Sequence, residues 1–438
     1  MKDKEVSVAI AGAGLVGSML GSLLAKHGYK VDIIEKRSDP RTVDFSEGRS
    51  INLALSHRGM RTLEMAGVKH QVLQKAIPMK GRMIHNEDGS RHFLPYGKEG
   101  QQIYSVSRNE LNKVLINAAE ESGANIVFDR KISDINLADL NLDGRNFDFL
   151  FGADGAFSQV RKTLVEEGKS EEELHSLMHG YRELTMPPIN GNFAMEPNAL
   201  HIWPREQFML IALPNADKTF TCTLFLPFEG EQSFDRLKSP VDLNRFFSRY
   251  FADVLPLIPN LADVFFQHSA SSLTMVKAFP WVYKSVCLLG DSAHAIVPFY
   301  GQGMNAGFED CRVLYSLISA GSLSGETLLE FQKERKVNAD AIAALSMRNF
   351  VEMRDLVKDR DFQLRKKIEA KLHEDLDDLY IPLYTMVTFS DKPYSEALEV
   401  SKRQDELFEK ILQIKDIYEQ WEEDDVWNKI KAMAREIR

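Results

Sequence analysis

Near its start the chain alternates between runs of apolar residues and amphipathic spacing. Residues 6–12 (VSVAIAG) are almost wholly apolar, which is typical of a strand buried on both faces. Over residues 15–27 apolar side chains recur at helical spacing, and Gly28 supplies a stop signal. Those on one face are Val16, Met19, Leu20, Leu23 and Leu24. Residues 29–35 (YKVDIIE) form a second apolar run, so the pattern predicts a βαβ unit and an α/β fold.

Two later regions have patterns of their own. The stretch FMLIALPNADKTFTCTLFLPF (208–228) contains two apolar runs around a turn signal, which predicts a β-hairpin. Residues 326–375 and 395–437 are highly charged with helical apolar spacing, which predicts C-terminal helices. One of their apolar faces consists of Leu407, Ile411, Ile414, Tyr418 and Trp421. The abundant acids favour solvated helices with a core stripe over an in-plane membrane helix or a dimer helix.

Composition narrows the class of protein. The chain has 438 residues, is 44% hydrophobic and carries a net charge of −10, which argues against a nucleic-acid partner. Cys222, Cys287 and Cys311 show no CxxC spacing, so we interpret them as core residues of a protein in a reducing compartment. No cleavable leader and no run of about 18 apolar residues is present, so we expect a soluble, cytoplasmic protein without a membrane span.

A glycine fingerprint lies inside the predicted βαβ unit. GAGLVG matches GxGxxG at Gly12, Gly14 and Gly17, a pattern that brings the backbone close to a pyrophosphate. Glu35 ends the second strand, where a carboxylate can accept hydrogen bonds from a ribose diol and repels a 2′-phosphate. The pattern therefore predicts a dinucleotide site for FAD or NAD and disfavours NADP at this position.

Three further segments add to this fingerprint. A dinucleotide needs only one glycine-rich fingerprint, so the later strand ends with Gly and Asp imply a longer ligand. SVSRNELNKVL (105–115) places the cation of Arg108 where a helix begins. FLFGADGAFSQVR (149–161) places Asp154 directly after an apolar strand. GDSAHAIVPFYGQGMNAGFED (290–310) places Asp291 at a third strand end, followed by a glycine-rich turn and a helix that begins near Met304. The alternative for Asp291 is a helix N-cap, which leaves the GQG segment unexplained.

This combination of segments resembles the flavoprotein aromatic hydroxylases, which are single-component FAD monooxygenases. The resemblance implies a Rossmann-like FAD-binding fold in which Asp291 holds the ribityl chain and the helix N-terminus faces the electron-rich edge of the flavin. It implies FAD contacts from Gly12, Gly14, Val16, Gly17, Glu35, Arg37, Ala54, Arg108, Ile132, Asp154, Asp291, Met304 and Asn305. The contacts of Val16, Ala54 and Ile132 are expected to be made by their backbone.

Within that family, six longer stretches are similar to the hydroxylases of kynurenine. They are GRSINLALSHRG (48–59), KGRMIHNEDGSRHFLPYG (80–97), HIWPREQFMLIALPN (201–215), VPFYGQGMNAGFED (297–310), MRNFVEMRD (347–355) and IPLYTMVTFSDKPY (381–394). The resemblance implies that Arg82 and Tyr96 hold the amino-acid end of L-kynurenine, with Asn349 and Tyr384 completing the pocket. A guanidinium offers a carboxylate a planar, charged fork. Pro298 and Phe299 are expected to wall the aniline ring.

The implied reaction consumes NADPH and molecular oxygen. Reduced FAD forms a C4a-hydroperoxide that delivers oxygen to the carbon ortho to the aniline nitrogen, giving 3-hydroxykynurenine. No catalytic side chain is assigned, because an electron-rich aniline needs no strong base. We interpret His294 as structural, and no Cys or His cluster has metal-ligand spacing.

The resemblance also implies a domain division. We expect an FAD-binding domain at 1–180 with a substrate-pocket insertion around 70–105, a β-sheet substrate domain at 181–280, a return to the FAD-binding domain at 281–325 and a helical region at 326–438. A homodimer is possible. Two other functions stay open: a flavin hydroxylase or reductase of another aromatic acid, and a non-catalytic flavin-binding protein.

Overall fold

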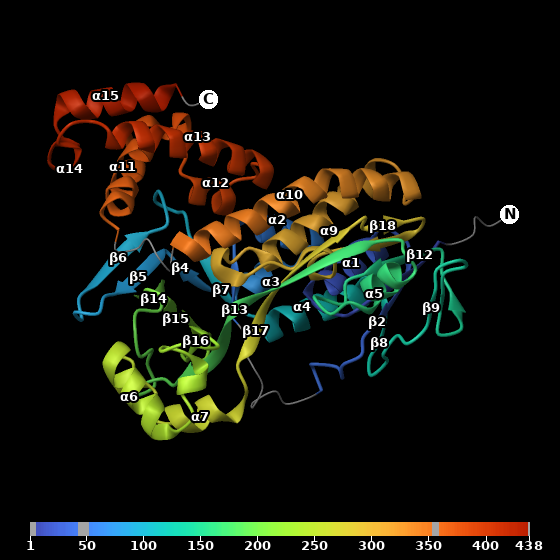
Figure 1. The fold of residues 1–438 in the computed structure, drawn as a ribbon. Helices are drawn as coiled ribbons and strands as arrows, with labels where there is room; N and C mark the ends of the chain where they lie inside the picture. Colours follow the sequence, from blue (N-terminus) through green and yellow to red (C-terminus); the bar gives the residue numbers. More distant parts are fainter. Residues whose placement is uncertain (1–5, 43–51, 353–358, 437–438) are drawn as a thin grey trace.

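The structure is a computed structural model that describes residues 6–42, 52–352 and 359–436. Of the stretches quoted above, residues 48–51, 353–358 and 437 lie outside the described part. Figure 1 shows two large sheets crossed by long helices, with the last helices gathered at one end of the molecule.

The first sheet confirms the predicted βαβ unit. Its strand order is β18-β19-β12-β1-β2-β8, and all neighbours are parallel except β18 with β19. The strands are β1 (Ser7–Ala11), β2 (Lys30–Ile34), β8 (Asn125–Val127), β12 (Phe149–Gly152), β18 (Val282–Tyr283) and β19 (Val286–Leu288). Helix α1 (Leu15–Lys26) connects β1 to β2, and Gly28 has φ +100° just after it. The carboxyl ends of these parallel strands share one edge, which is where ligands bind in such sheets.

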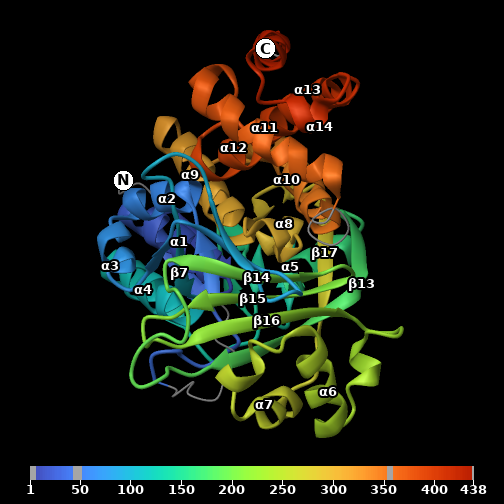
Figure 2. The same ribbon diagram turned by 90° about the vertical axis from the view of Figure 1, so that its left-hand side faces the viewer.

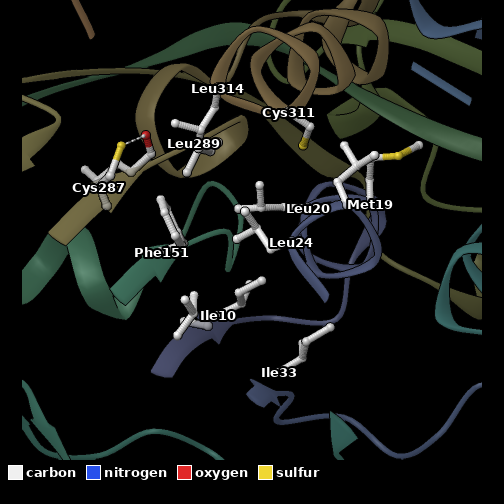
Figure 3. Close-up of a cluster of buried hydrophobic side chains, with 14 of the residues drawn as sticks. Ile10, Met19, Leu20, Leu24, Ile33, Phe151, Cys287, Leu289, Cys311 and Leu314 are labelled. Atoms are coloured by element: carbon white, nitrogen blue, oxygen red, sulfur yellow. Dashed lines mark hydrogen bonds between the residues drawn. The ribbon is translucent and has the colours of Figure 1, made fainter. Parts of the chain in front are cut away.

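The core of this part lies between the first sheet and two helices, α1 and α9 (Gly303–Ala320). Figure 3 shows the sheet side chains Ile10, Ile33 and Phe151 facing Leu20 and Leu24 of α1, with other members from further segments. Cys287 and Cys311 belong to this core, and Cys222 lies in a second one. Burial raises the pKa of the Cys222 thiol to about 12. The prediction that all three cysteines are core residues is confirmed.

The second sheet has seven strands in the order β17-β13-β16-β15-β14-β5-β6. The strands are β5 (Gly81–His85), β6 (Arg91–Pro95), β13 (Glu171–Met186), β14 (Ala199–Arg205), β15 (Phe208–Pro214), β16 (Phe220–Pro227) and β17 (Ser271–Phe279). The antiparallel pair β15–β16 confirms the predicted hairpin. β5 runs parallel to β14, so this sheet combines strands from residues 81–95 with strands from residues 171–279.

One face of the second sheet is covered by α6 (Pro240–Tyr250) and α7 (Leu261–Gln267), as Figure 2 shows. Large buried side chains fill this layer, among them Trp203, Phe220, Phe247 and Phe265. The other face turns toward α10 and the turn before α9, where the candidate site lies.

The remaining elements form two small sheets and the other helices. The small sheets are β3-β7-β4 and β11-β10-β9, with β3 (Asn52–Leu55), β4 (Ile77–Met79), β7 (Ile103–Ser107), β9 (Ile135–Asn136), β10 (Asn141–Leu142) and β11 (Arg145–Asn146). The other helices are α2 (His57–Ala66), α3 (Lys69–Leu73), α4 (Arg108–Glu121), α5 (Gln159–Glu166), α8 (Asp291–His294), α10 (Gly325–Val351), α11 (Arg360–Leu376), α12 (Leu383–Phe389), α13 (Tyr394–Leu412), α14 (Ile417–Gln420) and α15 (Asp424–Arg435).

The C-terminal helices form a core of their own at one end of the molecule (Figure 1). In the predicted apolar face, Leu407 and Ile411 are buried in this core, and Ile414, Tyr418 and Trp421 are partly buried and pack against the same core. This confirms a core stripe. Over the described ranges, no helix combines the length and the apolar character that a bilayer crossing requires.

A buried pair of histidines joins the neighbouring strands β5 and β14 of the second sheet. His85 lies 3.0 Å from a carboxylate oxygen of Asp253 (Nδ1 to Oδ2) and 2.9 Å from His201 (Nε2 to Nδ1). Nε2 of His201 donates to the carbonyl oxygen of Glu196 at 2.8 Å. Burial lowers the pKa of His201 from 6.5 to about 4, so this ring is neutral in the folded protein near pH 7.

We expect His201 to make the free energy of unfolding depend on pH. Below pH 6.5 the unfolded His201 binds a proton, whereas the folded side chain does so only near pH 4. Stability is therefore lost as the pH falls through this window, by up to about 3 kcal/mol. Urea unfolding between pH 7 and pH 4 measures the loss. His201→Gln should flatten the profile and His268→Gln, at an exposed position, should not. Identical profiles for His201→Gln and the parent would contradict the assignment.

Candidate active site

The glycine turn between β1 and α1 combines two packing constraints with one open side. A Cβ at Gly12, where φ is +98°, would lie 2.7 Å from the carbonyl oxygen of Ala153. A Cβ at Gly17 would lie 1.9 Å from the carbonyl oxygen of Gly12, so the protein itself needs both glycines. A Cβ at Gly14 would meet no described atom within 4 Å. The open side is thus at Gly14, where the first N–H groups of α1 can receive a pyrophosphate.

Glu35 lies at the end of β2 and faces this turn. Its Oε2 accepts a hydrogen bond from the backbone N–H of Ala13 at 2.8 Å, and its Oε1 accepts one from the Arg37 side chain at 2.9 Å. Burial alone would raise the pKa of Glu35, but the hydrogen bonds and charge of Arg37 lower it overall. The carboxylate is therefore ionised and held at the place where a ribose diol would lie.

The segment of Ile132 runs beside this pair. The N–H of Arg130 donates to the carbonyl oxygen of Glu35 at 2.9 Å. The Ile132 side chain is buried in the first core, so only its backbone can face a ligand. This geometry is compatible with the expected backbone contact near the adenine.

Ser292 follows Asp291 directly and hydrogen-bonds to Asp154, so it brings the two strand ends together. Sequence reasoning missed this serine. Ser292 accepts a hydrogen bond from the N–H of Gly155 at 2.9 Å and donates to Oδ1 of Asp154 at 3.2 Å. Asp291 is exposed, and no hydrogen bond or ion pair joins its carboxylate to any other described residue. Its carboxylate can therefore accept hydrogen bonds from ligand hydroxyls. The signal for Ser292 was its place directly after the GD pair.

The N-cap alternative for Asp291 does not match the structure. Gly290 is the N-cap of α8 and Gln302 is the N-cap of α9, and neither helix has a side-chain cap hydrogen bond. The first N–H groups of α9 are thus available, and the positive end of this 18-residue helix favours a negatively polarised group.

Arg108 is the first residue of α4 and is exposed. One turn further on, Asn112 donates a hydrogen bond to the carbonyl oxygen of Ala13 at 3.2 Å. This bond joins the start of α4 to the glycine turn, so the Arg108 cation belongs to the same region as Gly14. Sequence reasoning did not single out Asn112.

The side chain of Asn305 fixes the start of α9. Its Oδ1 accepts from the N–H of Ser56 at 3.0 Å, and its Nδ2 donates to the carbonyl oxygens of Ala54 at 2.9 Å and Gly301 at 3.0 Å. Asn305 is 0% exposed. Its side chain is thus occupied by protein partners, which leaves its backbone, with that of partly buried Met304, to face a flat ring.

Val16 packs where the glycine turn, the GD pair and α9 meet. A Cβ at Gly290 would lie 3.0 Å from Cγ2 of Val16, and one at Gly307 would lie 2.7 Å from the same atom. The Val16 side chain therefore fills a gap between backbones. Its expected contact with FAD can come only from the main chain.

The predicted amino-acid site is a guanidinium among tyrosine rings. The Arg82 guanidinium lies 4.6 Å from the ring centre of Tyr384 and 5.5 Å from that of Tyr96. Nε of Arg82 and the hydroxyl of Tyr96 are buried and reach no hydrogen-bond partner among the described residues. No described carboxylate pairs with Arg82. The structure thus brings Arg82 and Tyr96, which are expected to hold the amino-acid end, together with Tyr384, which is expected to complete the pocket, and no described carboxylate neutralises the cation.

The electrostatics of this cluster keep Arg82 charged. Burial by itself would lower the pKa of Arg82, but the oxygens of Tyr384 and Tyr96 raise it overall. Burial raises the pKa of Tyr96 well above 10, so that phenol stays neutral. A neutral hydroxyl beside a cation is suited to a ligand carboxylate.

Tyr300 extends this cluster toward the cofactor side, and sequence reasoning missed it. Its ring stacks on Tyr384 at 5.7 Å, and Tyr384 stacks on Tyr96 at 5.3 Å. Gly301 follows Tyr300, and a Cβ there would lie 3.2 Å from Cβ of Ala54, which itself packs against the apolar cluster containing Tyr96. The amino-acid site therefore adjoins the GQG turn.

The stacked rings of Tyr96, Tyr384 and Tyr300 form a tyrosine ladder. Beside this ladder lie Pro298, Phe299 and Asn349. The ring of Phe299 packs on Phe350 at 4.3 Å and on Phe225 at 5.1 Å, while Pro298 is exposed. Asn349 of α10 donates from Nδ2 to the carbonyl oxygen of Phe299 at 2.6 Å. This bond fixes the turn that presents Tyr300, which gives Asn349 a positional role whatever it contacts in a ligand.

His294 has a structural environment, as expected. Its Nε2 lies 2.6 Å from Oδ2 of Asp310, and its ring packs on Trp281 at 5.1 Å. Within the described ranges, no group of three or more His, Cys, Asp or Glu side chains could hold a metal ion.

Comparisons with known proteins identify the family. Residues 5–346 match the model of the FAD binding domain family. A kynurenine 3-monooxygenase of Christiangramia forsetii is 46% identical over 446 residues, which cover 99% of this chain and 100% of that protein. The chain belongs to the kynurenine 3-monooxygenase family. The Sus scrofa kynurenine 3-monooxygenase is 45% identical over 90% of this chain and 86% of its own length. The predicted resemblance and the FAD cofactor are thereby confirmed.

Solved structures support the fold. The tetrameric form of 2-methyl-3-hydroxypyridine-5-carboxylic acid oxygenase superposes with a TM-score of 0.69 and 21% identity, over 81% of this chain and 94% of that one. PqsL of Pseudomonas aeruginosa, described as a probable FAD-dependent monooxygenase, gives a TM-score of 0.65 and 20% identity, over 80% of this chain and 97% of that one. The predicted FAD-binding fold with a β-sheet part and C-terminal helices is confirmed.

The glycine turn separates packing from cofactor binding. We expect Gly14→Ala to leave the unfolding free energy of the FAD-free protein within about 1 kcal/mol, because the new methyl meets no protein atom. FAD affinity should fall, since the methyl points toward the pyrophosphate position. Titration of FAD into the FAD-free protein, followed by flavin fluorescence, measures the change.

Gly17→Ala is the matched control. Its methyl would overlap the Gly12 carbonyl oxygen, so we expect the FAD-free protein itself to lose about 3 kcal/mol of stability. Equal stability losses in the two variants would show that the side of the turn at Gly14 is not open.

Proposed function

We propose that the chain is an FAD-dependent, NADPH-consuming hydroxylase that converts L-kynurenine to 3-hydroxykynurenine. The observation that carries the proposal is the Arg82 guanidinium, which lies against the rings of Tyr96 and Tyr384 and has no carboxylate partner among the described residues. The full-length similarity to kynurenine 3-monooxygenases supports the choice of substrate.

Recognition of the amino-acid end follows from the chemistry of Arg82. A guanidinium binds a carboxylate through two parallel, charge-assisted hydrogen bonds. Nε of Arg82 and the Tyr96 hydroxyl are the unpaired buried groups that such a carboxylate would satisfy. Leaving them unpaired costs free energy in the folded chain, which the carboxylate of kynurenine offsets on binding.

The aromatic end of kynurenine would lie toward the GQG turn. The apolar cluster of Met79, Tyr96, Ile103 and Leu213, with Ala54 and Phe389 against it, provides the walls of this region. Such walls exclude water from the ring and orient it by shape. Since an aniline is electron-rich, the side chains need only position the ring carbon that is to be hydroxylated.

The cofactor residues have a similar positional task. Bound FAD, reduced by NADPH, supplies the activation of molecular oxygen. Glu35 would hold the ribose of the adenosine and Asp291 the ribityl hydroxyls, while the Gly14 side of the turn would receive the pyrophosphate. The first N–H groups of α9 would stabilise negative charge on the flavin edge beside them.

Arg82→Met tests the proposal. We expect the dissociation constant for kynurenine to rise by about 30-fold or more, because one partner of a buried charge pair is lost, which corresponds to at least about 2 kcal/mol. FAD affinity should be unchanged, since the ring partners of Arg82, Tyr96 and Tyr384, are not among the expected FAD contacts. The measurements are kynurenine titration of the FAD-loaded protein and NADPH oxidation, with the 3-hydroxy product detected by mass.

Arg91→Met is the control, because Arg91 is exposed on the neighbouring strand β6 and should leave kynurenine binding unchanged. Parent-like kynurenine affinity in Arg82→Met would overturn the carboxylate assignment. A parent protein that oxidises NADPH with another aromatic acid but not with kynurenine would favour the second hydroxylase function. Bound FAD that no aromatic acid causes to turn over would favour a structural flavin.

A further inference from the structure

Arg58 is a fully buried arginine that belongs to neither half of the candidate site. It lies in the first turn of α2, and its side chain is 0% exposed. Its Nε donates to the carbonyl oxygen of Val387 at 3.1 Å, its Nη2 donates to that of Lys392, and the guanidinium lies 4.0 Å from the ring centre of Tyr394. These three partners all come from residues 387–394, which are more than 300 positions away in sequence.

One of the partners, Val387, lies in the last turn of α12, and Lys392 lies in the short loop that follows this helix. The last four carbonyl groups of a helix have no partner within the helix and carry partial negative charge. Val387 belongs to this last turn of α12, which contains no basic side chain of its own. Arg58 supplies the missing donor from another part of the fold. Tyr384 lies in the first turn of the same short helix, so the position of its ring depends on how the helix end is held.

The other side of the Arg58 guanidinium contacts helix α9. Its Nη1 donates to Oε1 of Glu309 in α9 at 2.9 Å, and Glu309 also accepts from Arg312 at 2.8 Å and from Arg335 at 3.0 Å. Burial alone would raise the pKa of Glu309, but the three guanidinium groups lower it overall. The anchor is therefore an ionised carboxylate on the helix whose first turn adjoins the GQG turn.

A second contact between the same segments is exposed. Arg61 of α2 pairs with Asp391, and their side chains are 47% and 44% exposed. Exposed pairs contribute little because water and salt screen them. The buried contacts of Arg58 are the stronger connection between α2, α9 and the end of α12.

We propose that Arg58 is a positioning residue that sets the place of Tyr384 relative to Arg82 by tying the end of α12 to Glu309. It acts through the helix, because none of its hydrogen-bond and ring partners among the described residues belongs to the amino-acid cluster or to the expected FAD contacts. The part of this inference that concerns kynurenine rests on the function proposed above, whereas the part that concerns α12 does not.

Hydrogen exchange tests the structural part without substrate. In FAD-loaded Arg58→Lys, which keeps the charge but loses the fork, we expect amides of residues 383–392 to exchange at least about tenfold faster than in the parent. Amides of α1 should be unchanged. Glu309→Gln, which keeps an acceptor for Arg58 but removes its charge, should give a smaller increase at the same residues. Unchanged protection of α12 in both variants, or an increase spread over the whole chain, overturns the proposal.

Kinetics test the functional part. We expect Arg58→Lys to raise KM for kynurenine about tenfold with kcat within about twofold and FAD affinity unchanged, because Tyr384 binds and does not react. Arg61→Lys is the matched control on the same helix and should match the parent. A parent that does not bind kynurenine refutes the proposed function and leaves the exchange result standing. Normal KM in Arg58→Lys beside a parent that binds kynurenine refutes the positioning role.

Discussion

The buried carboxylate of Asp310 holds together the parts of the fold that form the cofactor region. Its Oδ2 accepts from the N–H of Gly290 at 3.0 Å and lies 2.6 Å from Nε2 of His294, and its Oδ1 accepts from Arg335 at 2.7 Å. Burial opposes its ionisation, yet His294 and Arg335 lower its pKa to about 2. The charge therefore persists at any working pH. It fixes Gly290, at φ +56°, directly before the exposed Asp291.

The positions of the proposed cofactor region and of the amino-acid cluster both depend on how helix α9 is held. Glu309 and Asp310 anchor helix α9 near its middle through ion pairs with Arg335. Asn305 separately holds the first turn of α9 against β3. The same helix thus determines where the GQG turn lies, and in the proposed function its first turn would face the flavin edge. Tyr300 directly precedes that turn, and its ring stacks on the ring of Tyr384. A rigid scaffold around a few open polar groups is what a reaction governed by placement requires.

Much of this arrangement could be predicted because its signals are local. The βαβ unit, the 208–228 hairpin and the C-terminal stripe follow from apolar periodicity, which reports neighbours within a few residues. The acids at strand ends follow from the rule that parallel strands end at one edge. The choice of Arg82, Tyr96 and Tyr384 came from resemblance, and the structure brings them together.

Other features depend on contacts between distant segments or on the phase of a short turn. Arg58 and Val387 are 329 positions apart, and Ser292 and Asp154 are 138 positions apart, so no periodicity connects them. In the turn Pro298–Tyr300, the ring that joins the tyrosine ladder belongs to Tyr300, whereas Phe299 packs between the sheet and α10. The backbone conformation of the turn decides which of these two adjacent rings faces Tyr384, and the pattern of apolar residues does not reveal that conformation.

The unpaired Arg82 has a consequence for how the protein responds to heat. Nε of Arg82 and the hydroxyl of Tyr96 are buried without a hydrogen-bond partner among the described residues, which lowers the stability of the fold. An apolar residue of similar size in place of Arg82 should therefore give a more stable protein that no longer binds a carboxylate. The same imbalance means that any small carboxylate able to enter should raise the melting temperature in proportion to the logarithm of its concentration. The groups that would bind the carboxylate therefore lower the stability of the fold as long as no ligand is present.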